Sequence, residues 1–463
     1  MLNEIHADRY LFSPGHAAAE RNVSIPFKIA GEQRQKLNAR STLIMPAPVN
    51  AHDHGYGIRT IDFAGYDDAL EVWSPSLAMR PNVDPYLKAT VAFGRLVSSG
   101  VCSTMHCHNA SSTGDLVEEA GLVIQAAKDV GIHLAFSCPL IDSNPWVYDG
   151  PNALKPHMSP SEWESLSHAI PKYKMAKDQI AAVEAIATNH HGPGADIQYG
   201  PIGPQWCSEE LLGLIADGSK NSGRRIHMHL LETERQRLWL DQKYPQGIIP
   251  YLDSIGFLSP RLSVAHGVQL RPEECDLMAE RGVIVVSNPS ANLRLRSGIA
   301  PVHDFRTAGL KYAIGLDGTG FDDDQDYWRE MRLFYLLHGG RSLVRETSAQ
   351  EVFDAAIHVG SQVVNRPKRN DCVLINYDAL TKDAIFDDLE ETEVILTRMT
   401  RQYVAGLIVD GKWVVENGKT VNIDLDECKK ELRKQARSLS SQIEPSRNSV
   451  RQLQVAIRRY YAS

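Results

Sequence analysis

The chain has 463 residues and a formal net charge of −8 at pH 7; 43% of its residues are hydrophobic and 23% are charged. This balance is typical of a folded globular protein, and the length predicts one large domain with a smaller one. The negative charge excludes a general electrostatic attraction to nucleic acid or to anionic membranes.

Residues 1–9 contain no long apolar run, so we expect neither a signal peptide nor a membrane span there. The seven cysteines are scattered, without a C-x-x-C pair. A disulfide framework or a zinc site made only of cysteines is therefore not expected, and the cytoplasm is the predicted location.

The middle of the chain alternates short apolar runs with helical segments, as βα units around a parallel sheet do. Several of the helical segments end in Gly, which commonly follows the last turn of a helix. We predict an α/β fold, a (β/α)8 TIM-type barrel over residues 41–365. The predicted strands are STLIMPAPVNAH, VCSTMHCH, HLAFSCPL, IQYGPIGP, RIHMHLL, LSVAHG, VIVVSNP and YAIGLDG.

The segments outside this barrel have a different character. The runs CVLINYD, EVILTRM and YVAGLIVDGKWVVENGKTV predict short strands joined by turns. The first forty residues hold only weak strand signals, and we assign residues 1–40 and 366–425 to one small β-sandwich. Residues 426–463 predict two helices broken at Pro445, whose basic residues suit a solvated face or a subunit contact better than an anionic partner.

One connection within the barrel is unusually long. The stretch between residues 139 and 172 is rich in Pro, Trp, Tyr and Asn. It is either a disordered surface loop or a lid over the barrel mouth, because the loops that follow barrel strands build the active sites of this fold.

Histidines and a carboxylate fall at the ends of four predicted strands. Residues two apart on a strand point to the same side, so both rings of a His-x-His pair can face one ion. Each feature alone is weak, but strand ends of one barrel converge on one axial space. Three imidazoles and a carboxylate suit Zn²⁺, Fe²⁺, Co²⁺ or Mn²⁺. The features are His52-Asp53-His54, His227-Met228-His229, His266 and Asp317.

These stretches resemble the amidohydrolase superfamily, specifically its mononuclear branch of deaminases and chlorohydrolase-like enzymes. The matching stretches, in the family's order, are PAPVNAHDHG, HMHLLETE, VAHGVQL, SNPSANLRLRSGIAPV and YAIGLDGTG. The resemblance implies that the metal ligands are His52, His54, His229 and Asp317. His229 is preferred to His227 because it opens the family's His-x-x-Glu motif.

The same resemblance predicts one metal ion. Binuclear members place a bridging lysine at the end of the fourth strand, and IQYGPIGPQW contains none. We therefore expect a single divalent ion, zinc first, with iron, manganese or cobalt as alternatives. A bound cation lowers the pKa of its water towards about 7.

The predicted enzyme is a hydrolase of a non-peptide C–N bond in a small molecule. Asp317 would accept the proton of the attacking water, Glu232 would deliver a proton to the leaving nitrogen, and His266 would polarise the substrate or steady the hydroxide. Deamination of an amino-substituted N-heterocycle and hydrolysis of an amide, urea or carbamate both fit. The alternative is a metal-free barrel scaffold.

Further residues near the strand ends are predicted to bind the substrate. His106 and His108 could instead be additional metal ligands. A homo-oligomer is also expected, because barrels with added helices commonly associate. The predicted substrate-binding residues are Tyr56, Arg59, His106, His108, Gln205 and Trp206.

Overall fold

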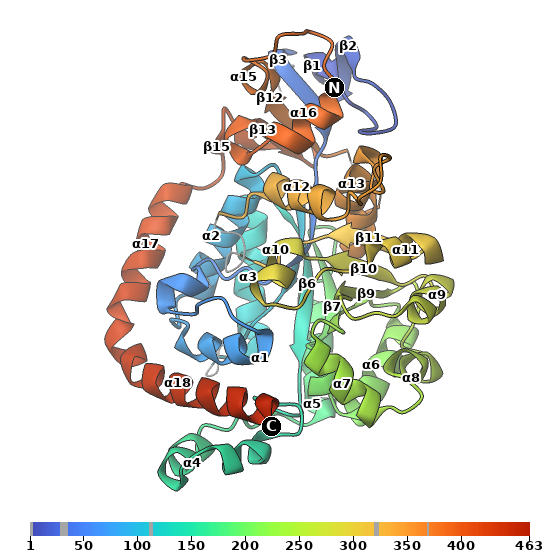
Figure 1. Cartoon of the computed structure of the whole chain (residues 1–463). Helices are drawn as coiled ribbons and strands as arrows, with labels where there is room; N and C mark the ends of the chain where they lie inside the picture. Colours follow the sequence, from blue (N-terminus) through green and yellow to red (C-terminus); the bar gives the residue numbers. More distant parts are fainter. Residues whose placement is uncertain (1–2, 28–35, 111–113, 319–323, 368–369) are drawn as a thin grey trace.

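The computed structural model of the chain describes residues 3–27, 36–110, 114–318, 324–367 and 370–463 (Figure 1). Eight parallel strands follow one another around a barrel, each paired with the next along the chain. They are β4 (Val49–Asp53), β5 (Ser103–Cys107), β6 (His133–Leu140), β7 (Ala195–Pro201), β8 (Ile226–Leu230), β9 (Leu262–His266), β10 (Ile284–Ser287) and β11 (Lys311–Ile314).

The end of β11 returns to β4, which brings the last strand back to the first. The backbone N–H groups of Leu316 and Asp317 both donate to the carbonyl of His52, at 3.1 and 2.9 Å. The predicted (β/α)8 barrel is therefore confirmed. Nearly all residues of its strands are buried, as expected of a parallel sheet covered by helices on the outside and filled by side chains on the inside.

Helices cover the outside of the barrel, and several end at a Gly, as the sequence predicts. The Asp115 carboxylate caps α3 by accepting from two backbone N–H groups, and Ser208 caps α6. Gly131 and Gly223 end these helices at φ +91° and +74°. The principal covering helices are α2 (Pro85–Ser98), α3 (Leu116–Val130), α5 (Ala176–His190), α6 (Glu209–Ser222), α7 (Glu234–Lys243), α8 (Ile248–Ser254), α9 (Pro272–Glu280), α11 (Val302–Ala308) and α12 (Tyr327–Leu337).

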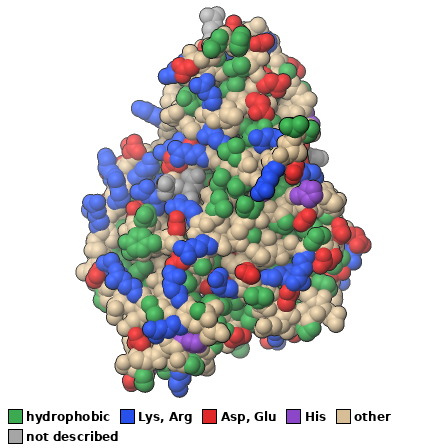
Figure 2. All heavy atoms as spheres, viewed as in Figure 1, with side chains coloured by type: hydrophobic (Ala, Val, Ile, Leu, Met, Phe, Trp, Pro, Cys, Tyr) green, Lys and Arg blue, Asp and Glu red, His purple; other side chains and the backbone are tan. Residues whose placement is uncertain are grey.

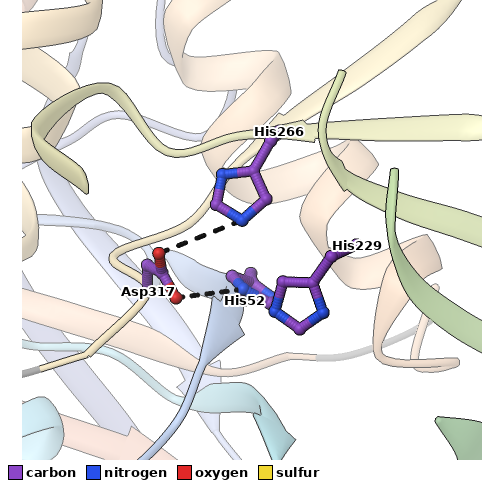
Figure 3. Close-up of side chains that lie close together, drawn as sticks. All are labelled: His52, His229, His266 and Asp317. Atoms are coloured by element: carbon purple, nitrogen blue, oxygen red, sulfur yellow. Dashed lines mark ion pairs between the residues drawn. The ribbon is translucent and has the colours of Figure 1, made fainter. Parts of the chain in front are cut away.

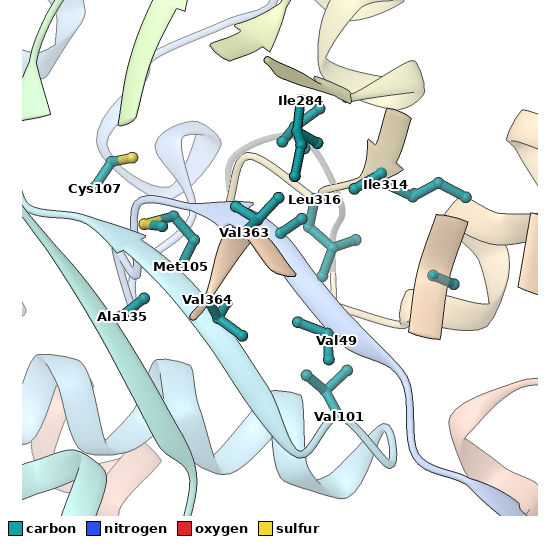
Figure 4. Packing of buried hydrophobic residues seen from close by; sticks show 14 of the residues in the cluster. Val49, Val101, Met105, Cys107, Ala135, Ile284, Ile314, Leu316, Val363 and Val364 are labelled. Atoms are coloured by element: carbon teal, nitrogen blue, oxygen red, sulfur yellow. The ribbon is translucent and has the colours of Figure 1, made fainter. Parts of the chain in front are cut away.

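Short helices lie in the connections between the barrel strands and after the last of these strands, next to the main core. Side chains from several strands and from α14 meet there in one apolar core, in which Val49, Met105 and Val363 lie (Figure 4). The short elements are η1 (Thr60–Phe63), α1 (Leu70–Trp73), η2 (Ser74–Met79), η3 (Pro151–His157), α4 (Pro160–Ser167), η4 (Pro204–Trp206), α10 (Pro289–Arg294), α13 (Ala349–Phe353), η5 (Asp354–Val359) and α14 (Gly360–Val363).

The two ends of the chain meet in one mixed seven-stranded sheet, ordered β15-β14-β13-β12-β3-β1-β2. The N-terminal strands are thus present despite their weak sequence signals. The strands are β1 (Asn3–Tyr10), β2 (Glu20–Phe27), β3 (Lys36–Pro46), β12 (Cys372–Asn376), β13 (Val404–Val409), β14 (Lys412–Glu416) and β15 (Lys419–Thr420), with α15 (Tyr377–Leu380), α16 (Glu391–Arg398) and η6 (Arg401–Tyr403) beside them.

Two details of this region differ from the prediction. The run predicted as the first barrel strand is divided, because β3 pairs with β12 as far as Pro46 and the barrel begins only at Val49. Pro46 and Pro48 have no N–H to donate to a ladder, which separates the two strands. The run EVILTRM is helix α16, because Glu391, Val394 and Ile395, spaced as one helix face, are buried and outweigh its β-branched composition.

The C-terminal residues form two helices, α17 (Leu425–Ser438) and α18 (Ser440–Ala462), which run down one side of the barrel and across its far end (Figure 1). The break lies at Leu439, not at the predicted Pro445, which is inside α18. Apolar side chains on both sides of the break, including Leu432 and Val450, pack against residues around η1 and α2. This packing fixes the bend, and the missing N–H of Pro445 costs one hydrogen bond in an early turn.

The long connection after β6 is ordered and packs against α18. Val147, Leu154 and Leu166 share an apolar cluster with Leu453 and Ile457 of that helix. The disordered alternative is therefore wrong for this connection, and a lid function stays a prediction. Among the described residues, no helix is long and apolar enough to cross a membrane.

We predict that Gly315→Ala destabilises the protein by about 1–3 kcal/mol, because the site is fully packed. An added Cβ would lie 2.5 Å from Oδ1 of Asn288 and 2.7 Å from Cβ of His52. Urea unfolding measures the change. Gly213→Ala is the matched control: it lies within α6 with no atom within 4 Å of its added Cβ, and we expect a gain of about 0.5–1 kcal/mol. Equal effects of the two substitutions would contradict the prediction.

Candidate metal centre

The predicted ligands come together at the carboxyl ends of the barrel strands. His52 lies on β4, His229 on β8 and His266 at the end of β9, while Asp317 follows β11. The backbone φ angles of His266 and Asp317 are +74° and +63°, values that residues other than Gly seldom adopt. Such strain is typical of functional sites, where the surrounding structure holds it in place.

The distances define one cluster (Figure 3). Oδ1 of Asp317 lies 3.2 Å from Nε2 of His52 and 3.1 Å from Nε2 of His54. Nε2 of His54 also lies 3.2 Å from Nε2 of His229. One ligand atom each of His52, His229, His266 and Asp317 lie within 4.8 Å of one another. This group contains three of the four predicted ligands together with His266, and the fourth, His54, lies against Asp317 and His229.

The chemistry of the cluster fits a divalent metal ion. Burial lowers the pKa of His52 and of His229 well below the ordinary value, so these rings are neutral, the form that binds metals. Burial alone would raise the pKa of Asp317, but hydrogen bonds from His52 and His54 hold it well below its usual range. Nε2 of His266 is buried without a hydrogen-bond partner among the described residues. Nitrogen and carboxylate donors of this kind suit one zinc-like cation.

Hydrogen bonds behind the cluster hold its rings in place. Nδ1 of His52 lies 2.8 Å from Nε2 of His227, whose Nδ1 lies 2.8 Å from Oγ of Ser263. Nδ1 of His229 donates to the carbonyl of Ile202 at 2.8 Å. Partners of this kind fix the tautomer and orientation of a ligating imidazole. These contacts suit the structural role predicted for His227.

Glu232 lies beside the cluster, two residues after β8. Its side chain is buried, with Oε2 3.7 Å from Nε2 of His266, and Oε1 has no hydrogen-bond partner among the described residues. Burial and the charges of Asp317 and Glu71 raise the pKa of Glu232 well above its ordinary value. This shift favours the protonated form of Glu232, which is the form that a general acid needs.

Three of the predicted substrate-binding residues lie around this centre. The ring of Tyr56 stacks on that of His54, with centroids 5.4 Å apart. Gln205 is fully buried, and neither polar atom of its side chain has a hydrogen-bond partner among the described residues. Trp206 packs against an apolar cluster that includes Tyr56 and Trp73. Tyr56 and Trp206 thus give this side of the centre an aromatic surface, and Gln205, next to Trp206 in the chain, adds a buried amide without a partner among the described residues.

The side chains of the other three pair with residues outside the cluster. Nε2 of His106 lies 3.3 Å from Nδ1 of His108, whose Nε2 pairs with Glu119 of α3 at 2.9 Å. Burial lowers the pKa of His108 to about 4. Arg59 pairs with Asp62 at 3.2 Å and lines a cavity beside α17 and α18. Gly57, with a φ of +66°, lies between Tyr56 and Arg59, where the chain turns away from the cluster.

Two buried residues of the site are absent from the sequence prediction. Oδ1 of Asn292 lies 2.9 Å from Nδ1 of His266. The carboxylate of Glu71 accepts from the hydroxyls of Tyr148 and Thr233, at 2.9 and 2.5 Å. Asn292 lies in the stretch SNPSANLR that resembles the family, which could have indicated it. Glu71 belongs to α1, far from any strand end in the sequence, and no local signal marks it.

Comparison with known proteins agrees with this geometry. The sequence model of the amidohydrolase family matches residues 43–414. The chain belongs to the amidohydrolase family. The resemblance inferred from the strand-end motifs is thereby confirmed.

Similar amidohydrolases include two curated deaminases and a solved structure. The 5′-deoxyadenosine deaminase of Methanosarcina mazei is 29% identical over 65% of this chain, and the match spans only 63% of that protein's own length. The 5-methylthioadenosine/S-adenosylhomocysteine deaminase of Desulfitobacterium hafniense is 23% identical, with 94% of this chain and 93% of that protein covered. A zinc-bound adenosine deaminase from Xanthomonas campestris superposes with a TM-score of 0.76 at 20% identity, over 94% and 98% of the two chains.

We predict that His227→Phe weakens metal affinity roughly 10- to 100-fold, because the ring keeps its size but His52 loses its partner. Competition with a chelating dye measures the affinity. His303→Phe is the control, since the side chain of His303 is 73% exposed and lies on α11. Unchanged affinity in the His227 variant would show that this contact does not position His52.

Proposed function

We propose that this amidohydrolase removes an amino group as ammonia from the purine ring of an adenosine-type nucleoside. The coarser activity is hydrolysis of a non-peptide C–N bond. The observation that carries it is the buried Glu232 beside a cluster of His52, His229, His266 and Asp317. The names of the similar deaminases support the choice of an adenosine-type substrate.

The donor set would hold one divalent ion, zinc first. Bound there, such an ion supplies Lewis acidity and a water that ionises near neutral pH. The ligands proposed for it are His52, His54, His229 and Asp317. His266 is proposed to act on the water instead. With its Nδ1–H held by Asn292, its Nε2 presents a lone pair toward the cluster.

The residues provide the proton transfers that deamination needs. Water adds to the ring carbon that carries the amino group and gives one proton to Asp317, while Glu232 protonates the adjacent ring nitrogen. The proton of the new hydroxyl then passes to Glu232, which donates it to the amino nitrogen; the C–N bond breaks, and ammonia leaves as the ring carbon becomes a carbonyl. Nε2 of His266 lies 3.7 Å from Oε2 of Glu232 and 3.9 Å from Oδ2 of Asp317. The ring of His266 can therefore carry the proton from Asp317 back to Glu232.

The rim of the centre suits a flat heterocycle. The apolar cluster that contains Tyr56, Leu70, Trp73 and Ala291 offers aromatic and aliphatic surface. The unpaired amide of Gln205 has both donors and an acceptor, as recognition of a ring edge requires. Both features support an amino-substituted heterocycle over an aliphatic amide, urea or carbamate.

The predicted scaffold without metal receives no support from the residues. A barrel that had lost its metal would be expected to lack a metal ligand or the acid. In this chain the predicted ligands converge, namely His52, His54, His229 and Asp317, and Glu232 lies beside them. Cytoplasmic location and assembly into a homo-oligomer stay predictions. Light scattering of the purified chain tests the latter.

We expect Glu232→Gln to retain about one metal ion per chain and to lose at least about 100-fold in kcat, because the amide cannot donate the acidic proton. Glu234→Gln is the matched control, since Glu234 is an exposed first-turn residue of α7. Elemental analysis and ammonia release provide the two readouts. A fully active Glu232→Gln variant would remove Glu232 from the mechanism.

We expect Asp317→Asn to lose both the metal and the activity, and we expect chelation of the wild-type enzyme to have the same effect, reversible by zinc.

The substrate is tested by ammonia release from 5′-deoxyadenosine, 5′-methylthioadenosine, an aminotriazine and an aryl urea. Turnover of the adenosine-type compounds at least tenfold above the others supports the proposal. Turnover of the aryl urea alone would overturn it while leaving the C–N hydrolase in place.

A further inference from the structure

A second cavity, of about 730 Å³, lies on the side of the barrel between η1, α2 and the two C-terminal helices. This volume is within the range of roughly 300–1,000 Å³ typical of small-molecule sites. Phe63, Val91 and Leu432 form part of its apolar floor. Arg59 lines this cavity together with Gly57 and Asp62, whereas its described lining includes no proposed metal ligand and neither Glu232 nor His266.

The walls of this cavity are strongly basic. Six of its lining residues are Lys or Arg and two are Asp or Glu, although the whole chain has a net charge of −8. Figure 2 shows Lys and Arg side chains gathered over this side of the molecule, along α17. The local excess of positive charge attracts anions at a distance and stabilises them once bound. The basic residues are Arg59, Arg95, Lys429, Arg433, Arg437 and Arg447.

Three of these arginines make no ion pair among the described residues. Arg95 donates to the carbonyl of Gly57 at 2.9 Å, and Arg433 donates to the carbonyl of Lys429 at 3.2 Å. Arg433 and Arg437 are four residues apart on α17 and therefore share one face of the helix. Burial, together with the charges of Arg59 and Arg401, lowers the pKa of Arg95 to about 10. An anion in the cavity would relieve this crowding of like charges.

The cavity also exposes apolar and aromatic surface beside the arginines. The side chains of Ile61 and Tyr66 are 55% and 65% exposed and line the same space. Guanidinium groups bind phosphate in bidentate fashion, and an exposed tyrosine ring offers a face for stacking. The cavity is far larger than inorganic phosphate requires, so a larger anion with a flat body fits it best.

We propose that this cavity binds a nucleoside phosphate, with the phosphate on Arg433 and Arg437 and the base against Tyr66. The site is separate from the metal centre and is independent of the reaction proposed there. It shares a loop with that centre, however, because Gly57, to which Arg95 donates, directly follows Tyr56.

Calorimetric titration of the metal-loaded chain with uridine diphosphate tests the proposal. Uracil carries no amino group, so the probe is not a substrate for the proposed deamination. We expect one bound molecule per chain, and an affinity at least tenfold lower for uridine and for inorganic phosphate. Arg433→Gln combined with Arg437→Gln should weaken binding at least tenfold. Lys434→Gln, an exposed neighbour on α17 that pairs with Glu431, should not change it.

Other outcomes would overturn the proposal. No binding of uridine diphosphate, or equal binding by the double variant, would remove the arginines from any such site. Equal affinity for inorganic phosphate would exclude a nucleotide as the ligand. Asp317→Asn should leave the affinity unchanged, whereas loss of binding in that variant would place the nucleotide at the metal centre. Circular dichroism checks that the substitutions at Arg433, Lys434 and Arg437, which are exposed positions of α17, leave this helix folded.

Discussion

The contact between Asp317 and His52 is the constraint on which the rest of the structure depends. The backbone N–H of Asp317 donates to the carbonyl of His52 where the last barrel strand returns to the first, and its carboxylate lies against the rings of His52 and His54. One residue therefore joins the last strand to the first and gathers the donor set. A buried cluster of polar and charged side chains is stable only when its members pair with one another or coordinate a metal.

The parts outside the barrel support this centre from two sides. The seven-stranded sheet fixes the chain just before β4, because β3 pairs with β12 up to Pro46. The connection after β6 reaches the opposite side, where Tyr148 donates to the buried Glu71, and α18 packs against that connection. Glu71 also accepts from Thr233, the neighbour of Glu232, so the end of the chain contributes indirectly to the acid's surroundings.

The sequence alone determined the strand-end residues and therefore the barrel and the set of donors. His-x-His spacing and the positions of His266 and Asp317 depend only on strand periodicity and on the convergence of strand ends, both of which are local or general. The Gly residues that end several helices could also be predicted, since each acts on its own stretch of backbone.

Features that depend on contacts between residues far apart in the sequence were decided only by the tertiary structure. The run EVILTRM became a helix because packing outweighed its composition, and the chain bends at Leu439 because an apolar cluster from η1 and α2 holds both helices. Arg59 faces the second cavity, and Glu71 and Asn292 join the metal centre, through contacts between segments far apart in the chain. Local sequence could not predict these, because the burial that selects each side chain's neighbours exists only once the barrel has closed.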